Sequence, residues 1–114
     1  MAMLDPHIRG ADRVREVFAR VANGDVGVAD LYAEDAVITH GGGGRVEGRE
    51  AIRTFYERAI DALFPQPRLE GVIEAPPLFV AIVDVPTSAT RFRALDLFEV
   101  DDEGIRRLEI YTQR

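Results

Sequence analysis

The chain has no cysteine among its 114 residues and no long apolar segment. A disulfide framework, a thiolate nucleophile and a cysteine metal site are therefore excluded. The longest strongly apolar run, residues 78–83, is far shorter than the roughly 20 residues that span a bilayer. Basic residues are also fewer than acidic ones, with 14 Lys and Arg against 20 Asp and Glu. A net charge of −6 disfavours nucleic-acid binding, so we expect no nucleic-acid partner and no membrane insertion.

Several catalytic motifs are missing as well. The sequence contains no HExxH, no GxSxG and no phosphate-binding loop, since the glycines at 41–44 lack the Lys-Ser/Thr ending. The two histidines, His7 and His40, are far apart, so we expect no metal site and no cofactor. The N-terminus has no apolar stretch after a basic start, which favours a cytoplasmic protein.

The first half of the chain reads as helical. Asp5 is a good N-cap for a first helix with Pro6 at its first position, and Asn23-Gly24 is a stop signal. Asp25 can cap a short second helix that ends near Tyr32. Gly48 opens the clearest helix, with an apolar stripe from residue 52 to residue 63.

The second half reads as strands. Residues 36–40 form a first strand, and residues 69–75, 78–85, 89–100 and 105–113 are apolar segments separated by turn residues. Helices followed by hairpin-linked strands predict a single α+β domain over residues 1–114, with three N-terminal helices packed on a strongly curved antiparallel sheet.

Alternation along residues 90–100 assigns the side chains to faces. Phe92, Asp96 and Phe98 share the parity of the core, whereas Leu95 and Leu97 lie among charges on the other face. A half-apolar outer face predicts a partner sheet, most simply in a homodimer.

Asp96 and His40 are the residues best placed for chemistry. Burial of the Asp96 carboxyl raises its pKa, and a neutral acid can donate a hydrogen bond to a developing oxyanion. The alternative is a structural Asp96 satisfied by an amide or an arginine. His40 ends a strand just before the glycines, where an imidazole can transfer protons, or it is a solvated loop residue without a role. Of the tyrosines, Tyr56 lies on the apolar stripe and needs a buried partner for its hydroxyl.

Several stretches resemble the SnoaL-like and ketosteroid-isomerase-like members of the NTF2-like superfamily. They are residues 32–38 with 46–52, the pair Phe55-Tyr56, and residues 95–100 with 104–109. The resemblance implies a cone-shaped fold enclosing an apolar pocket. It is specific for the fold and a poor guide to function, because the superfamily includes isomerases, polyketide cyclases, dehydratases, epoxide hydrolases and non-enzymes.

The isomerase pattern carries over in part. It places the base at His40, the protonated acid at Asp96 and two supporting tyrosines at Tyr32 and Tyr56. The donor tyrosine of the first helix falls at Val17 or Phe18, neither of which can donate. The expected pocket-lining residues are Phe18, Phe92, Phe98, Leu108, Ile110 and Thr112.

These residues support one main hypothesis and two alternatives. The main one is an isomerase- or cyclase-type enzyme that moves a proton next to a carbonyl of a small hydrophobic molecule, of steroid, polyketide or terpenoid type, with His40 as base. The first alternative is a non-catalytic dimeric ligand-binding or accessory protein. The second is a hydrolase or dehydratase using the same pocket. If His40 instead contacts Asp96, the two form a structural ion pair, and the ligand-binding or accessory protein is favoured over the enzyme.

Overall fold

The computed structural model describes residues 6–41 and 43–113. Its elements follow the order α1 (Pro6–Ala22), η1 (Val26–Leu31), β1 (Tyr32–His40), β2 (Gly44–Glu47), α2 (Arg49–Leu63), β3 (Arg68–Ala75), β4 (Leu78–Pro86), β5 (Arg91–Asp101) and β6 (Gly104–Gln113). The three helices and the four later strands confirm the predicted α+β class. Asp5, the expected cap of the first helix, lies outside the described residues.

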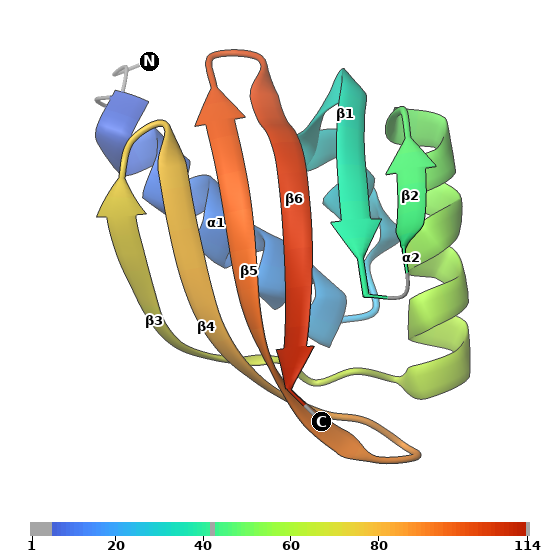
Figure 1. Cartoon of the computed structure of the whole chain (residues 1–114). Helices are drawn as coiled ribbons and strands as arrows, with labels where there is room; N and C mark the ends of the chain where they lie inside the picture. The colour runs from blue at the N-terminus through green and yellow to red at the C-terminus, as the bar shows by residue number, and fades with distance from the viewer. Residues whose placement is uncertain (1–5, 42, 114) are drawn as a thin grey trace.

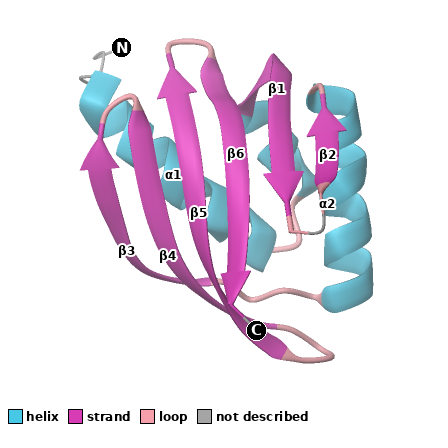
Figure 2. Ribbon diagram, in the orientation of Figure 1, coloured by secondary structure: helices cyan, strands magenta, loops and turns pink. Residues whose placement is uncertain are grey.

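The sheet has six strands in the order β2-β1-β6-β5-β4-β3, with the helices on one face (Figures 1 and 2). The prediction of an antiparallel sheet is wrong for one pair, because β1 runs parallel to β6. Hairpins force antiparallel pairing only between strands that follow one another closely, and more than sixty residues separate β1 from β6. The sheet is therefore mixed.

The sheet is also less curled than expected. Its long strands bend gradually over the helices (Figure 1). Bulges sharpen such bends, and the register shifts of the β3–β4 and β5–β6 pairs lie near strand ends, whereas the shift of the β1–β6 pair lies between Tyr32 and Val37. The prediction of a strongly curved sheet is therefore wrong, and the sheet is gently curved.

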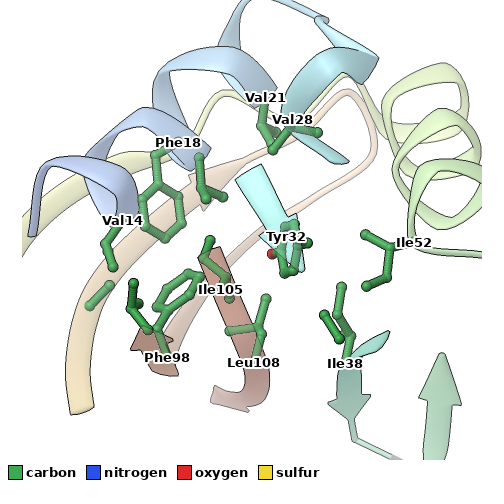
Figure 3. Packing of buried hydrophobic residues seen from close by; sticks show 14 of the residues in the cluster. Val14, Phe18, Val21, Val28, Tyr32, Ile38, Ile52, Phe98, Ile105 and Leu108 are labelled. Atoms are coloured by element: carbon green, nitrogen blue, oxygen red, sulfur yellow. The ribbon is translucent and has the colours of Figure 1, made fainter. Parts of the chain in front are cut away.

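The core lies between the helices and the sheet. Fully buried side chains come from α1, η1, β1, α2, β4, β5 and β6, and several of them are drawn in Figure 3. The burial pattern of β5 follows the predicted parity, with Ala94, Asp96 and Phe98 buried and Leu95 exposed. Asp96 therefore faces the helices, as its position in the sequence predicts.

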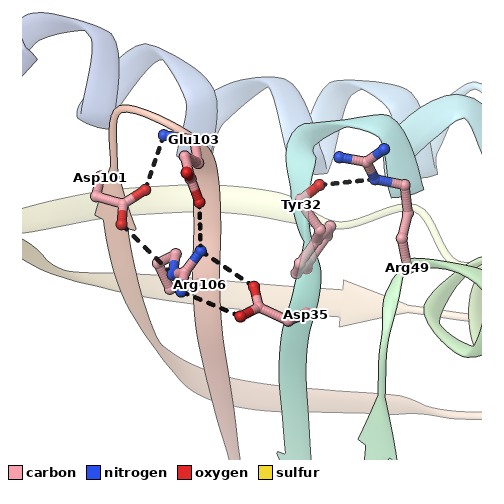
Figure 4. A network of polar contacts seen from close by, with 6 residues as sticks. All are labelled: Tyr32, Asp35, Arg49, Asp101, Glu103 and Arg106. Carbon is pink, nitrogen blue, oxygen red and sulfur yellow. Dashed lines mark hydrogen bonds and ion pairs between the residues drawn. The ribbon is translucent and has the colours of Figure 1, made fainter.

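Two arginines form side-chain contacts between elements at the start of β1 and around the β5–β6 turn (Figure 4). Arg106 of β6 forms ion pairs with Asp35 of β1 and with Asp101 and Glu103 around the β5–β6 turn. The Arg49 Nε–H at the start of α2 donates to the main-chain oxygen of Tyr32 at 2.9 Å. These contacts therefore join β1 to β6 and the start of α2 to the η1–β1 junction.

No helix among the described residues is long and apolar enough to cross a membrane.

Candidate active site

An apolar cavity of about 310 Å³ lies between α1, α2 and the helix-facing side of the sheet. Val17, Phe18 and Val21 of α1 border it from one side, and Phe55 and Tyr56 of α2 border it from another. Strands β4, β5 and β6 supply its floor, and Pro65 and Pro67 from the segment after α2 close one end. A mostly apolar cavity with a few polar groups is typical of small-molecule sites.

Most of the residues that the sequence predicts at a pocket do border this cavity. They are His40, Asp96, Val17, Phe18, Tyr56, Phe92, Leu108, Ile110 and Thr112. Alternation along β5 and β6 explains the result, since Phe92, Asp96, Leu108, Ile110 and Thr112 all share the helix-facing parity of their strands.

Two predicted pocket residues do not border the cavity. Phe98 is fully buried and packs edge-to-face on Phe18, with ring centroids 6.0 Å apart. Tyr32 is also fully buried and lies behind Tyr56, so it can reach a ligand only through that residue. Alternation along β5 predicts the observed face of Phe98, whereas Tyr32 is named by the family resemblance alone. A neighbouring side chain separates each of them from the cavity.

Asp96 lies on the cavity wall, and the described residues give it no charged partner. Only 7% of the residue is exposed, and its Oδ1 atom has no hydrogen-bond partner in the described part of the chain. Burial raises the pKa of Asp96 to about 7, because the apolar surroundings disfavour the carboxylate. The carboxyl is therefore neutral in a large share of molecules at pH 7 and can donate a hydrogen bond into the cavity.

His40 borders the same cavity from the end of β1. Its ring packs on Phe55 of α2, with centroids 5.6 Å apart and planes inclined by 32°. Among the described residues no ion pair joins it to Asp96, whose raised pKa is due to burial alone. Of the two arrangements left open by the sequence, the described structure therefore has the one in which His40 and Asp96 form no ion pair.

Tyr32 and Tyr56 form a buried hydroxyl pair. Their oxygens are 2.5 Å apart. Burial raises the pKa of both phenols, and the negative charge available at Asp96 contributes in the same direction. Both hydroxyls are thus protonated at neutral pH, with one proton shared in the Tyr32–Tyr56 hydrogen bond.

The sequence analysis missed several cavity residues. Val21, Phe55, Ala59, Leu63 and Val85 border the cavity together with the two prolines. The apolar stripe of α2 contained the signal for Phe55, Ala59 and Leu63, although it could not say which members of the stripe face a cavity and which are packed. In the described ranges, no group of three or more His, Asp or Glu side chains is close enough to hold a metal ion.

Solved structures with the same fold come from several bacteria. An NTF2-like protein of unknown function from Cytophaga hutchinsonii matches with a TM-score of 0.83 and 16% identity over 99% of this chain and 95% of that chain. A putative polyketide cyclase from Sinorhizobium meliloti matches with a TM-score of 0.80 and 22% identity over 88% and 94%. The epoxide hydrolase/cyclase-like enzyme SalBIII, described in pyran ring formation in the polyether salinomycin, matches with a TM-score of 0.82 and 18% identity over 92% and 91%.

At these identities the structural likeness shows the fold alone. No protein with a curated description matches the chain. The family model of the SnoaL-like domain matches residues 14–108, which run from α1 through the first half of β6 and include His40, Tyr56 and Asp96. This chain therefore belongs to the SnoaL-like domain family, with an NTF2-like fold.

Proposed function

We propose that the chain catalyses a cofactor-independent proton transfer next to the carbonyl group of a small hydrophobic molecule, in an isomerisation or ring closure. The observation that carries the proposal is the buried carboxyl of Asp96. Its unpartnered Oδ1 and its pKa of about 7 provide a neutral donor on the wall of the cavity that His40 also borders. Buried acids without partners cluster at functional sites.

The two residues divide the reaction between them. His40 takes a proton from the carbon beside the carbonyl. The electron pair of that C–H bond forms a carbon–carbon double bond, and the π electrons of the carbonyl move onto its oxygen. Neutral Asp96 donates a hydrogen bond to this oxygen and stabilises the enolate as it forms. Return of the proton from His40 to a carbon completes an isomerisation. In a ring closure the enolate carbon attacks a second carbonyl carbon of the same molecule, the first carbonyl re-forms, and His40 returns its proton to the new alkoxide.

Tyr56 supplies a second donor. The Tyr32–Tyr56 pair carries two hydroxyl protons, of which one lies in the hydrogen bond between them. If Tyr32 donates to Tyr56, the Tyr56 hydroxyl is left to donate elsewhere, and Tyr56 is the member of the pair that borders the cavity. This donor would compensate for Val17 and Phe18, which have no polar group.

The substrate class follows from the cavity wall. Apart from His40, Tyr56, Asp96 and Thr112, the bordering side chains are apolar. Such a wall favours a compact hydrocarbon skeleton with few oxygen atoms, as in steroid-, polyketide- or terpenoid-like molecules. The cyclases among the proteins of similar fold support the same substrate class.

A homodimer through the outer face of the sheet is part of the proposal. On that face Ile82 of β4, Leu95 of β5 and Tyr111 of β6 are cross-strand neighbours. Leu95 is 48% exposed and Tyr111 is 58% exposed. Exposed apolar side chains on β5 and β6, next to the half-buried Ile82 of β4, favour burial against a second copy of the sheet.

The proposed activity can be tested with 2-tetralone, a bicyclic ketone with acidic protons beside its carbonyl. The full chain in D₂O should accelerate deuterium uptake at the carbons next to the carbonyl above the rate in buffer, as measured by proton NMR. His40→Ala should lose the acceleration, and added imidazole should restore part of it. A Thr54→Ala variant, on the exposed side of α2, is the matched control.

Failure has a defined meaning in this experiment. If 2-tetralone perturbs the NMR signals of cavity residues but exchanges no faster than in buffer, the cavity binds such molecules without catalysing proton transfer. The binding-protein alternative then replaces the enzyme.

A further inference from the structure

The ring of His40 occupies the space that a side chain at position 44 would need. His40 of β1 and Gly44 of β2 are direct partners in the antiparallel pair. A Cβ atom placed on Gly44 would lie 2.1 Å from Cε1, 2.3 Å from Nε2 and 2.7 Å from Nδ1 of the His40 ring. These separations are far inside van der Waals contact, so the observed ring position is available only with glycine at 44.

The position over Gly44 is also the position that brings His40 to the cavity. From there the ring meets Phe55 of α2, and both His40 and Phe55 border the cavity. Two elements therefore define the ring orientation, the bare backbone of β2 and an aromatic ring of α2. Any displacement of His40 from Gly44 changes its relation to Phe55 as well.

We infer that Gly44 is a positioning residue for His40, acting through the absence of a side chain. The inference rests on the proposed function, in which His40 is the base. Base catalysis is sensitive to placement, because an error of about 1 Å can cost on the order of 100-fold in rate. The competing explanation is structural, since an aromatic ring that covers a cross-strand glycine can simply stabilise an edge strand such as β2.

Alanine at 44 separates these explanations without unfolding the chain. Gly44 is not among the glycines with positive φ, so alanine adopts its backbone conformation without strain. The colliding atoms belong to the end of a flexible side chain, which can rotate away. Gly71 of β3 is the matched control, because a Cβ added there meets nothing within 4 Å and its φ is also not positive.

The test combines ring contacts with exchange kinetics. In Gly44→Ala we expect loss of the nuclear Overhauser contact between the His40 and Phe55 rings and a 10- to 100-fold fall in kcat for 2-tetralone deuterium exchange, with KM nearly unchanged. Gly71→Ala should keep both, and thermal unfolding should show that both variants fold. In a His40→Ala background, Gly44→Ala should have no further effect, because it acts through the ring that is gone.

Three results would overturn the inference. The first is a retained His40–Phe55 contact in Gly44→Ala, the second is a lost contact with unchanged exchange, and the third is a Gly44→Ala effect that persists without His40. Failure of the proposed function is separate, because it shows as an absence of exchange by the wild-type chain. The ring contact in Gly44→Ala then decides alone whether Gly44 places His40.

Discussion

Asp96 couples the stability of the fold to pH. Its pKa is about 7 in the folded chain against about 3.9 when unfolded, so between these values the folded state holds a proton that the unfolded state has lost. Wild-type stability contributed by this group therefore falls as pH rises from about 4 to 7 and is constant above that range. Asp96→Asn should gain on the wild type across this window, by up to about 4 kcal/mol at pH 8.

Denaturant unfolding of both proteins at several pH values measures this difference. At pH 4 the two should be nearly equal, because both then carry a neutral group that can donate a hydrogen bond. A loss of about 3 kcal/mol or more in Asp96→Asn at pH 7 would instead mean that an ionised Asp96 has a buried partner.

The two buried tyrosines should differ in their effect on catalysis. Tyr56→Phe removes the hydroxyl at the cavity, and loss of one such donor typically costs about 100- to 1000-fold in kcat. Tyr32→Phe removes only the partner behind it and should cost less than about tenfold, with a measurable loss of stability from the unpaired Tyr56 hydroxyl. Rates of 2-tetralone exchange and unfolding midpoints distinguish the two. Equal losses of rate would show that neither hydroxyl contacts the substrate directly.

At the scale of single residues, the alternation of side chains along a strand predicted which residues face the cavity. The periodicity of a helix did not distinguish cavity residues from packed ones. Side chains on a strand have only two directions, so alternation alone places Phe92, Asp96 and Phe98 on one face of β5. Neither alternation nor the family resemblance, which names Tyr32, predicts depth, and both Phe98 and Tyr32 are buried outside the cavity lining. Their neighbours Phe18 and Tyr56 come from helices. The way in which a helix packs on a strand cannot be predicted from the sequence of either segment alone.

Among the elements, β2 was not predicted from the sequence. Four consecutive glycines suggest a loop, yet Gly44 already pairs with His40 and begins a strand. The pairing is supplied by β1, since residues 44–47 have little strand propensity of their own beyond Val46. The parallel arrangement of β1 and β6 was likewise out of reach, because no local signal connects segments so far apart in the chain.

The β5–β6 turn depends on a glycine that touches another element. Gly104 has a φ of +127°, and a Cβ added there would lie 2.8 Å from the main-chain oxygen of Leu31. Gly104→Ala should therefore destabilise the fold by about 1–3 kcal/mol, through backbone strain and loss of the close approach to η1. Denaturant unfolding measures the loss, with Gly71→Ala as the control that should change little. Equal stability of the two variants would contradict this account.

For the whole molecule, the outer face of the sheet is the surface on which association should depend. The row formed by Ile82, Leu95 and Tyr111 borders a hollow of about 470 Å³. Leu95→Glu places a charge at the middle of this row and should convert a dimer into a monomer without loss of helix or strand content. Light scattering at micromolar concentration gives the mass. A wild-type chain that is already monomeric under these conditions would refute the proposed homodimer.

The place of β6 between β1 and β5 has a consequence for the order of folding. Strands β3 to β6 follow one another as hairpins, so they can pair through short loops, whereas β1 has to find β6 across more than sixty intervening residues. Closing a long loop carries a larger entropic cost than closing a hairpin, and contacts between distant segments slow folding. We expect the β3–β6 meander to gain amide protection first in pulsed hydrogen exchange and the β1–β2 hairpin to gain it last. His40 is brought to the cavity that Asp96 borders only in that last step, so the site is assembled after most of the sheet. Simultaneous protection of all strands would contradict this order.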